Sequence, residues 1–221
     1  MRQRSAGPGP VVLIFLLTVS SVSAESLRYN IKWPSGLSLG EASLTTELTS
    51  RGTFTTLDLD ASLPAFTIRD HYTSSTSARI CTIQFQRETQ HGPKRSNESI
   101  TVNGEGKITR ETLNGGTTDL PTAPCPHDAL ALLSALRRDQ NQLPQTVLFG
   151  AGYPVRFESA GSQTITLNEK PTLTEKMICI VTLPKTGDYR LELFFLKDPT
   201  RTPALVLAPF ALGTFTMELI R

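Results

Sequence analysis

The sequence predicts an all-β, mainly antiparallel fold: a curved meander sheet, a half-open β-barrel or a sandwich, with a single short helix packed on the sheet. Three observations predict it. Apolar and polar residues alternate along most of the chain, which is typical of strands with one buried face. Turn-forming residues separate these segments at short intervals. Only the stretch of about 127–138 has apolar residues at helical spacing.

Residues 1–24 have the pattern of a cleaved export signal. Two arginines precede an apolar run over 11–19, and small residues lead to a cleavage site after Ala24. The run is shorter than the roughly 20 residues that a membrane-spanning helix needs, and no later segment is long enough to span. We therefore expect residues 25–221 to form a single β-rich domain in the periplasm or outside the cell, without a transmembrane segment.

Strands are expected wherever the alternation is strict. The alternating segments are 27–33, 57–61, 81–86, 153–157, 189–195 and 215–219. Residues 177–181 are apolar at every position instead, which predicts a central strand covered on both faces. The expected turns lie at 34–36, 50–52, 103–106, 114–116, 160–161 and 185–188, which contain the glycine, asparagine, proline and aspartate residues that turns favour.

The one predicted helix covers about 127–138. Its apolar stripe consists of Ala129, Leu132, Leu133 and Leu136. Pro126 fits a first-turn position, and an acidic residue near the beginning with two arginines near the end matches the helix macrodipole. A helix of about three turns cannot form a core alone. We expect it to cover or plug the concave face of the sheet and to divide the strands into two groups.

Three cysteines leave an odd count in a chain expected to enter an oxidising compartment. Cys125 lies in an irregular segment that needs an anchor, whereas Cys179 lies in the most apolar strand and is expected to be buried as a small hydrophobe. We therefore predict a disulfide between Cys81 and Cys125. Neither the cysteine nor the histidine spacing resembles a zinc site.

Charge and motifs exclude several classes of function. The net charge of +2 falls to zero without Arg2 and Arg4, and a neutral chain is not expected to bind nucleic acid. Asp70 and His71 are neighbours on one strand and point to opposite faces, so they do not form a catalytic pair. No hydrolase, metalloprotease, P-loop or dinucleotide motif occurs. We predict no catalytic residue, no metal and no cofactor.

Several segments together resemble one family. They are the opening strand 27–33 with 36–42, the strand end 68–72, the helix start 125–130, and the segments 149–153 and 211–219. This ensemble is similar to the exported bacterial family called domain of unknown function 3108, over nearly the whole chain after residue 24. The resemblance implies a periplasmic or exported β-rich protein without an assigned activity and without a catalytic motif.

Two classes of function remain, with a hydrolase as a remote third. The first is a non-catalytic binding or carrier protein for an apolar or amphipathic, lipid-like ligand of the cell envelope. Its candidate pocket-lining residues are Tyr29, Trp33, Leu133, Phe157, Leu193 and Phe195. The alternative is that the same residues form an ordinary packed core and line no pocket. The second is an assembly or interaction module that binds another envelope protein through 201–210, an apolar segment bracketed by prolines and thus suited to an edge strand.

Overall fold

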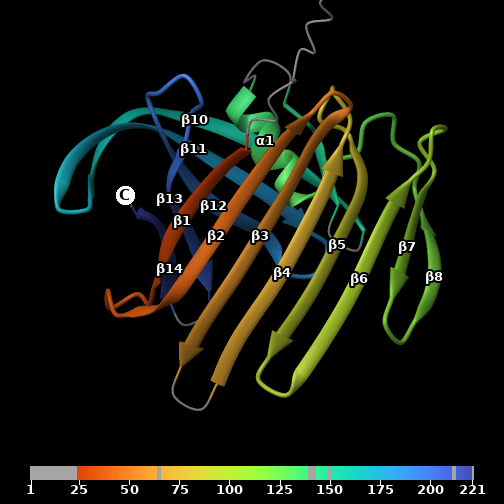
Figure 1. Cartoon of the computed structure of the whole chain (residues 1–221), viewed down its shortest axis with the longest axis horizontal. Helices are drawn as coiled ribbons and strands as arrows, with labels where there is room; N and C mark the ends of the chain where they lie inside the picture. The colour runs from red at the N-terminus through yellow and green to blue at the C-terminus, as the bar shows by residue number, and fades with distance from the viewer. Residues whose placement is uncertain (1–23, 64–65, 139–142, 149–150, 211–212, 221) are drawn as a thin grey trace, which may run out of the picture.

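The computed structural model describes residues 24–63, 66–138, 143–148, 151–210 and 213–220, so the predicted leader lies outside the description apart from Ala24. Within these residues, fourteen antiparallel strands form one strongly curved, unclosed sheet around a single helix (Figure 1), which confirms the predicted fold class. The elements are β1 (Ala24–Lys32), β2 (Ser38–Thr49), β3 (Gly52–Leu63), β4 (Phe66–Thr76), β5 (Thr82–His91), β6 (Lys94–Val102), β7 (Ile108–Thr112), β8 (Gly116–Leu120), α1 (Ala129–Arg138), β9 (Thr146–Leu148), β10 (Gly152–Leu167), β11 (Lys170–Leu183), β12 (Gly187–Leu196), β13 (Pro203–Phe210) and β14 (Gly213–Ile220).

The sheet consists of two meanders joined by the first and last strands. In the first, β1 to β8 each pair with the next strand along the chain, and in the second, β9 to β14 do the same. The strands β1 and β14 pair antiparallel, with Tyr29 opposite Leu219. The sheet therefore has the order β8 to β1 followed by β14 to β9, and β8 and β9 are its edges in the described part of the chain.

The prediction that 201–210 forms an edge strand is wrong. The strand β13 lies between β12 and β14, with Val206 opposite Leu193 on one side and Met217 on the other. Its prolines are tolerated because Pro203 is the first residue of the strand, next to a register shift, and the other is near the strand's end. The interaction-module interpretation thereby loses the observation that suggested it.

The turn predicted at 160–161 is also wrong. The strand β10 continues through this point, and its pairing with β11 shifts register between Ser159 and Ser162. Gly161 has φ = +72°, a backbone conformation that residues with a Cβ rarely adopt, so the glycine permits a bulge rather than a turn. The chain reverses at Asn168 and Glu169, which both have positive φ.

The central strand predicted over 177–181 is confirmed, since all five residues are buried. The strand β11 pairs with β10 on one side and β12 on the other. Met177, Cys179 and Val181 point to the same side and pack in one apolar cluster with Phe195.

The helix α1 packs between the two meanders (Figure 1). Leu130 contributes to a cluster with residues of β1 and β2, and Leu132 and Leu136 contribute to a cluster with residues of β9 to β12. The predicted start at 127 is two residues early, because Asp128 is the cap that precedes the first helical residue, Ala129. In the part of the chain that the structure describes, no helix has the length and apolar character needed to cross a membrane.

Candidate functional site

The start of α1 is fixed by a buried hydrogen-bond network around Asp128. Its Oδ1 accepts from the backbone N–H groups of Leu130 and Ala131 at 2.8 and 3.0 Å, which caps the helix. Its Oδ2 accepts from the hydroxyls of Ser74 and Thr82 at 2.6 and 2.7 Å. Burial raises the pKa of Asp128, and these four hydrogen bonds oppose that effect. The network ties α1 to β4 and β5.

A disulfide anchors the same region. Cys81 and Cys125 are bonded, as the sequence predicted, and the backbone N–H of Thr82 donates to Pro126 O at 2.8 Å beside the bridge. Cys179 is a buried free thiol, and burial raises its pKa to about 12. A thiol with so high a pKa is a poor nucleophile at neutral pH. It therefore acts as an apolar core residue, as predicted.

Next to the cap, His127 is buried and makes stability depend on pH. Burial lowers the pKa of His127 below 6.5, and the Cys125 backbone and Asp128 only partly oppose this. The unfolded chain therefore takes up a proton at this residue at a higher pH than the folded protein does. We expect the contribution of His127 to be complete above about pH 6.5 and to be lost as the pH falls through the lower pKa of the folded state.

Thermal unfolding between pH 8 and pH 5 tests this expectation. The melting temperature of the wild type should fall as the pH drops below about 6.5, and His127→Gln should reduce that dependence. Asp128 is retained in the variant, so its own titration, which has the opposite sign, cancels in the comparison. Equal slopes for the two proteins would contradict the assignment.

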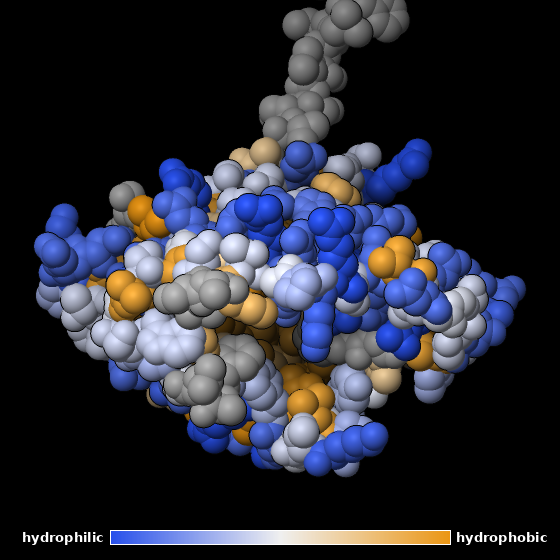
Figure 2. Space-filling view, turned by 90° about the horizontal axis from the view of Figure 1, so that it is seen from below, coloured by the Kyte–Doolittle hydropathy of each residue, from blue (hydrophilic) through white to orange (hydrophobic). Residues whose placement is uncertain are grey.

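Below α1, the inner face of the sheet is incompletely filled. We define the inner face as the side that carries Tyr29, Leu44 and Leu59 and packs against α1, and the outer face as the opposite side. Ten apolar residues of this cluster remain partly exposed: Leu27, Trp33, Leu57, Leu59, Ile68, Tyr72, Leu133, Ile165, Phe215 and Met217. Seen from below, the molecule is hollowed near its middle, and apolar side chains line this inner hollow (Figure 2).

The six predicted lining residues divide between core and hollow. Tyr29 and Phe195 are 0% exposed, and Tyr29 donates its hydroxyl hydrogen bond to Pro203 O at 3.0 Å, so both are core residues. Leu193 and Phe157 pack in the apolar cluster that α1 forms with residues of β9 to β12. Leu133 contacts both clusters. Trp33 belongs to the partly exposed set and meets Phe215 edge to face, with 4.8 Å between ring centroids.

The inner face turns polar on β4 to β7. Asp70 is buried, and its carboxylate accepts from the Tyr72 hydroxyl at 3.1 Å and lies 2.9 Å from Nε2 of His91. Burial and Asp70 both raise the pKa of Tyr72, so its phenol remains a neutral donor. His71 lies on the outer face and binds Asp58 at 2.6 Å, which agrees with the prediction that Asp70 and His71 do not act together.

Beside these groups lies a buried carboxylate that the sequence analysis did not select. Glu98 is 2% exposed, and its oxygens lie 2.8 Å from Nη2 of Arg87 and 3.5 Å from Nε of Arg110. All three side chains point to the inner face, because Arg87 is opposite Glu98 and Arg110 is opposite the buried Ile100. The sequence has no apolar alternation that marks this half of the strand, since the alternation ends at Phe85 whereas β5 continues to His91.

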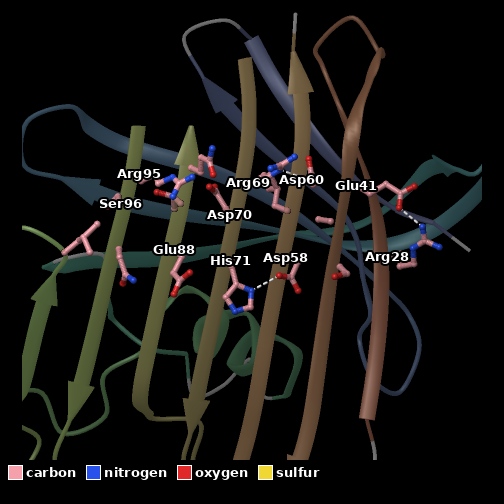
Figure 3. Close-up of a pocket in the computed structure, with 17 residues that line it drawn as sticks. Arg28, Glu41, Asp58, Asp60, Arg69, Asp70, His71, Glu88, Arg95 and Ser96 are labelled. Carbon is pink, nitrogen blue, oxygen red and sulfur yellow. Dashed lines mark hydrogen bonds and ion pairs between the residues drawn. The ribbon is translucent and has the colours of Figure 1, made fainter. Parts of the chain in front are cut away.

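The outer face carries a second concavity, of about 660 Å³, over β1 to β6 (Figure 3). Its charged side chains pair across neighbouring strands: Arg28 with Glu41 at 2.5 Å, Arg69 with Asp60 at 3.4 Å and His71 with Asp58 at 2.6 Å. These pairs are more than 45% exposed, and such pairs contribute little to stability. Opposite charges alternate here, which is typical of a solvated face. Nowhere in the described residues do three histidine, cysteine, aspartate or glutamate side chains gather as a metal site.

The family model described as protein of unknown function (DUF3108) matches residues 28–220. The chain belongs to this family. No curated protein matches the sequence of this DUF3108 member. A solved structure from Brucella abortus, the β-barrel-like protein of domain of unknown function DUF1849, is 11% identical, with a TM-score of 0.65 over 90% of this chain and 96% of that one. Lipoprotein LppX from Mycobacterium tuberculosis is 10% identical over 88% and 84% of the two chains, and its TM-score of 0.30 marks a much looser likeness.

Proposed function

We propose that this DUF3108 protein is an exported, non-catalytic binding or carrier protein for an apolar or amphipathic ligand. The ligand's chain would occupy the inner hollow. The observation that carries the proposal is the partly exposed apolar set on the inner face, in a molecule whose described helix lies at one end of the curved sheet (Figure 1). Binding sites of this class are concave and mostly apolar, with few polar groups.

The arrangement of the helix supports the same proposal. Arg137 near the end of α1 forms two hydrogen bonds with the Glu25 carboxylate, at 2.7 and 2.8 Å, and Arg138 donates to Ala78 O. The cap and the disulfide hold the other end of α1. The helix is thereby fixed as a cover at the end where β1 begins. Trp33 follows the last residue of β1, Lys32, and Phe215 precedes its partner Thr216, so these two contacting rings lie at the opposite end of β1.

Native mass spectrometry of residues 25–221, exported and purified without detergent, is the first test. A lipid-like mass that dissociates on denaturation supports the proposal. If the protein is empty, it is titrated with methyl laurate, a neutral chain probe. If neither measurement detects a bound lipid-like molecule or methyl laurate, the proposal is contradicted.

A substitution that fills the hollow locates the site. Leu59→Trp adds bulk to the partly exposed apolar set and should displace about two methylenes of a bound chain, lowering affinity for methyl laurate about tenfold. Thr56→Trp, on the outer face of the same strand, is the matched control and should leave the affinity unchanged. If this part of the inner face is fully packed, Leu59→Trp lowers the melting temperature by overpacking and has no specific effect on binding.

A further inference from the structure

The Glu98 cluster, formed by Arg87, Glu98 and Arg110, has more positive than negative charge. A carboxylate that is 2% exposed is costly unless cations compensate it, and two guanidinium groups do so here. One carboxylate neutralises only one of them. The side chains of Arg87 and Arg110 remain 32% and 31% exposed. A guanidinium has five N–H donors, so both arginines can bind a further oxyanion.

The Glu98 cluster continues directly from the inner hollow. Leu57 of β3 is opposite Tyr72 of β4, Tyr72 is opposite Arg87 of β5, and Arg87 is opposite Glu98 of β6. Leu57 and Tyr72 belong to the partly exposed apolar set, so one row of neighbouring side chains leads from apolar to charged. Opposite residues of paired strands lie about 5 Å apart. A chain in the hollow would thus have its polar end within reach of the arginines.

The other charged groups on this part of the inner face do not cancel the excess. Asp70 is already bound by His91 and Tyr72. Lys94, which is opposite His91, adds a further cation at the end of β6. The inner face of β4 to β7 therefore has three lysine and arginine residues against two carboxylates. The outer face of the same strands is balanced, with Arg69 and Arg95 against Glu88 and Glu111.

We propose that the Glu98 cluster binds the anionic head group of an amphipathic ligand, with Arg87 and Arg110 donating to a carboxylate or phosphate. The proposal rests on the ligand-binding function above and adds the chemical class of the ligand. Glu98 holds the two guanidinium groups in place and is a positioning residue. The shared chemistry is an oxyanion at the end of an alkyl chain.

The experiment compares probes that share a chain and differ in the head group. Calorimetric titration of the full-length processed protein with laurate, lauryl phosphate and methyl laurate is made at pH 8. We expect the wild type to bind at least one of the two anions about tenfold or more tightly than the neutral ester, because hydrogen bonds from arginine to a charged acceptor are stronger than those to the neutral ester carbonyl. The preferred anion distinguishes a carboxylate from a phosphate head group.

Two variants assign the preference to the Glu98 cluster. Arg110→Gln should abolish most of the difference in affinity between anion and ester, and Arg69→Gln, on the outer face, should leave that difference unchanged. Glu98→Gln keeps the shape and one side-chain oxygen that accepts from a guanidinium group, and it removes the internal negative charge, so the preference for the anion should be retained or increased. Loss of the preference in Glu98→Gln would contradict the assignment. This variant keeps the test informative if Arg110→Gln fails to fold.

The outcomes separate the two proposals. Equal affinity of the wild type for anions and ester would overturn the head-group assignment and leave the apolar binding site intact. A preference for the anion that survives in Arg110→Gln, or one that is lost in Arg69→Gln, would overturn the assignment as well. Binding of no probe at all would instead contradict the proposed function.

Discussion

Replacing Asp128 with alanine is expected to lower the free energy of unfolding by about 3 to 5 kcal/mol. The variant loses the helix cap and leaves the hydroxyls of Ser74 and Thr82 without their buried acceptor. Each lost partner leaves a desolvated donor, which is more costly than an absent hydrogen bond at the surface. Urea unfolding followed by circular dichroism measures the effect.

Two further variants show whether the cap network is responsible. Asp128→Asn keeps a side-chain acceptor for the helix N–H groups and should lose less stability than Asp128→Ala. Asp58→Ala removes an exposed carboxylate from the outer face and should change stability by less than about 0.5 kcal/mol. A loss of similar size in Asp58→Ala and Asp128→Ala would contradict the explanation.

The second large effect is expected from Cys81→Ser combined with Cys125→Ser. The bridge joins residues 44 positions apart, and the chain-entropy model gives a stabilisation on the order of 4 kcal/mol for a loop of this length. The loss should appear as a lower urea midpoint. Because the bridge and the Asp128 network hold the same end of α1, the two changes together should cost less than the sum of their separate effects.

The free thiol supplies the control for the disulfide. Cys179→Ala removes a buried cysteine without touching the bridge, and it should cost far less than the double serine variant. A reductant should lower the urea midpoint of the wild type and of Cys179→Ala alike, and have no effect on the double serine variant. A reductant effect on the double variant would show that another process is being measured.

The positions of most strands could be predicted from the sequence, but the pairing between strands could not. Alternation depends on one buried face, so segments such as 27–33 and 215–219 could be recognised from their own residues. Their pairing with each other depends on contacts between opposite ends of the chain, which no local pattern records. The same missing information made 201–210 look like an edge. At 160–161, glycine chemistry fits both a turn and a bulge, and only pairing with β11 distinguishes them.

The candidate site was predictable only in its apolar part. The aromatic and aliphatic residues were recognised, but a strand pattern does not tell a filled core from a hollow, and so Tyr29 and Trp33 were grouped together although only Trp33 is partly exposed. Arg87 and Glu98 were missed because charged residues in alternating strands usually face water. Their position on the inner face follows from the register of β5 and β6, which sequence alone does not give.

The pairing of β1 with β14 also has a consequence for folding kinetics. Hairpins within each meander form between neighbours in sequence and need little loop closure, whereas the joint between the meanders needs contact between the two most distant strands. Until that contact forms, each meander exposes apolar side chains that are later enclosed, and such intermediates aggregate readily. The inner hollow is therefore completed late, and we expect refolding to be slow and concentration-sensitive. If the hollow binds a ligand as proposed, a chain-bearing ligand that bridges the two halves should make refolding faster.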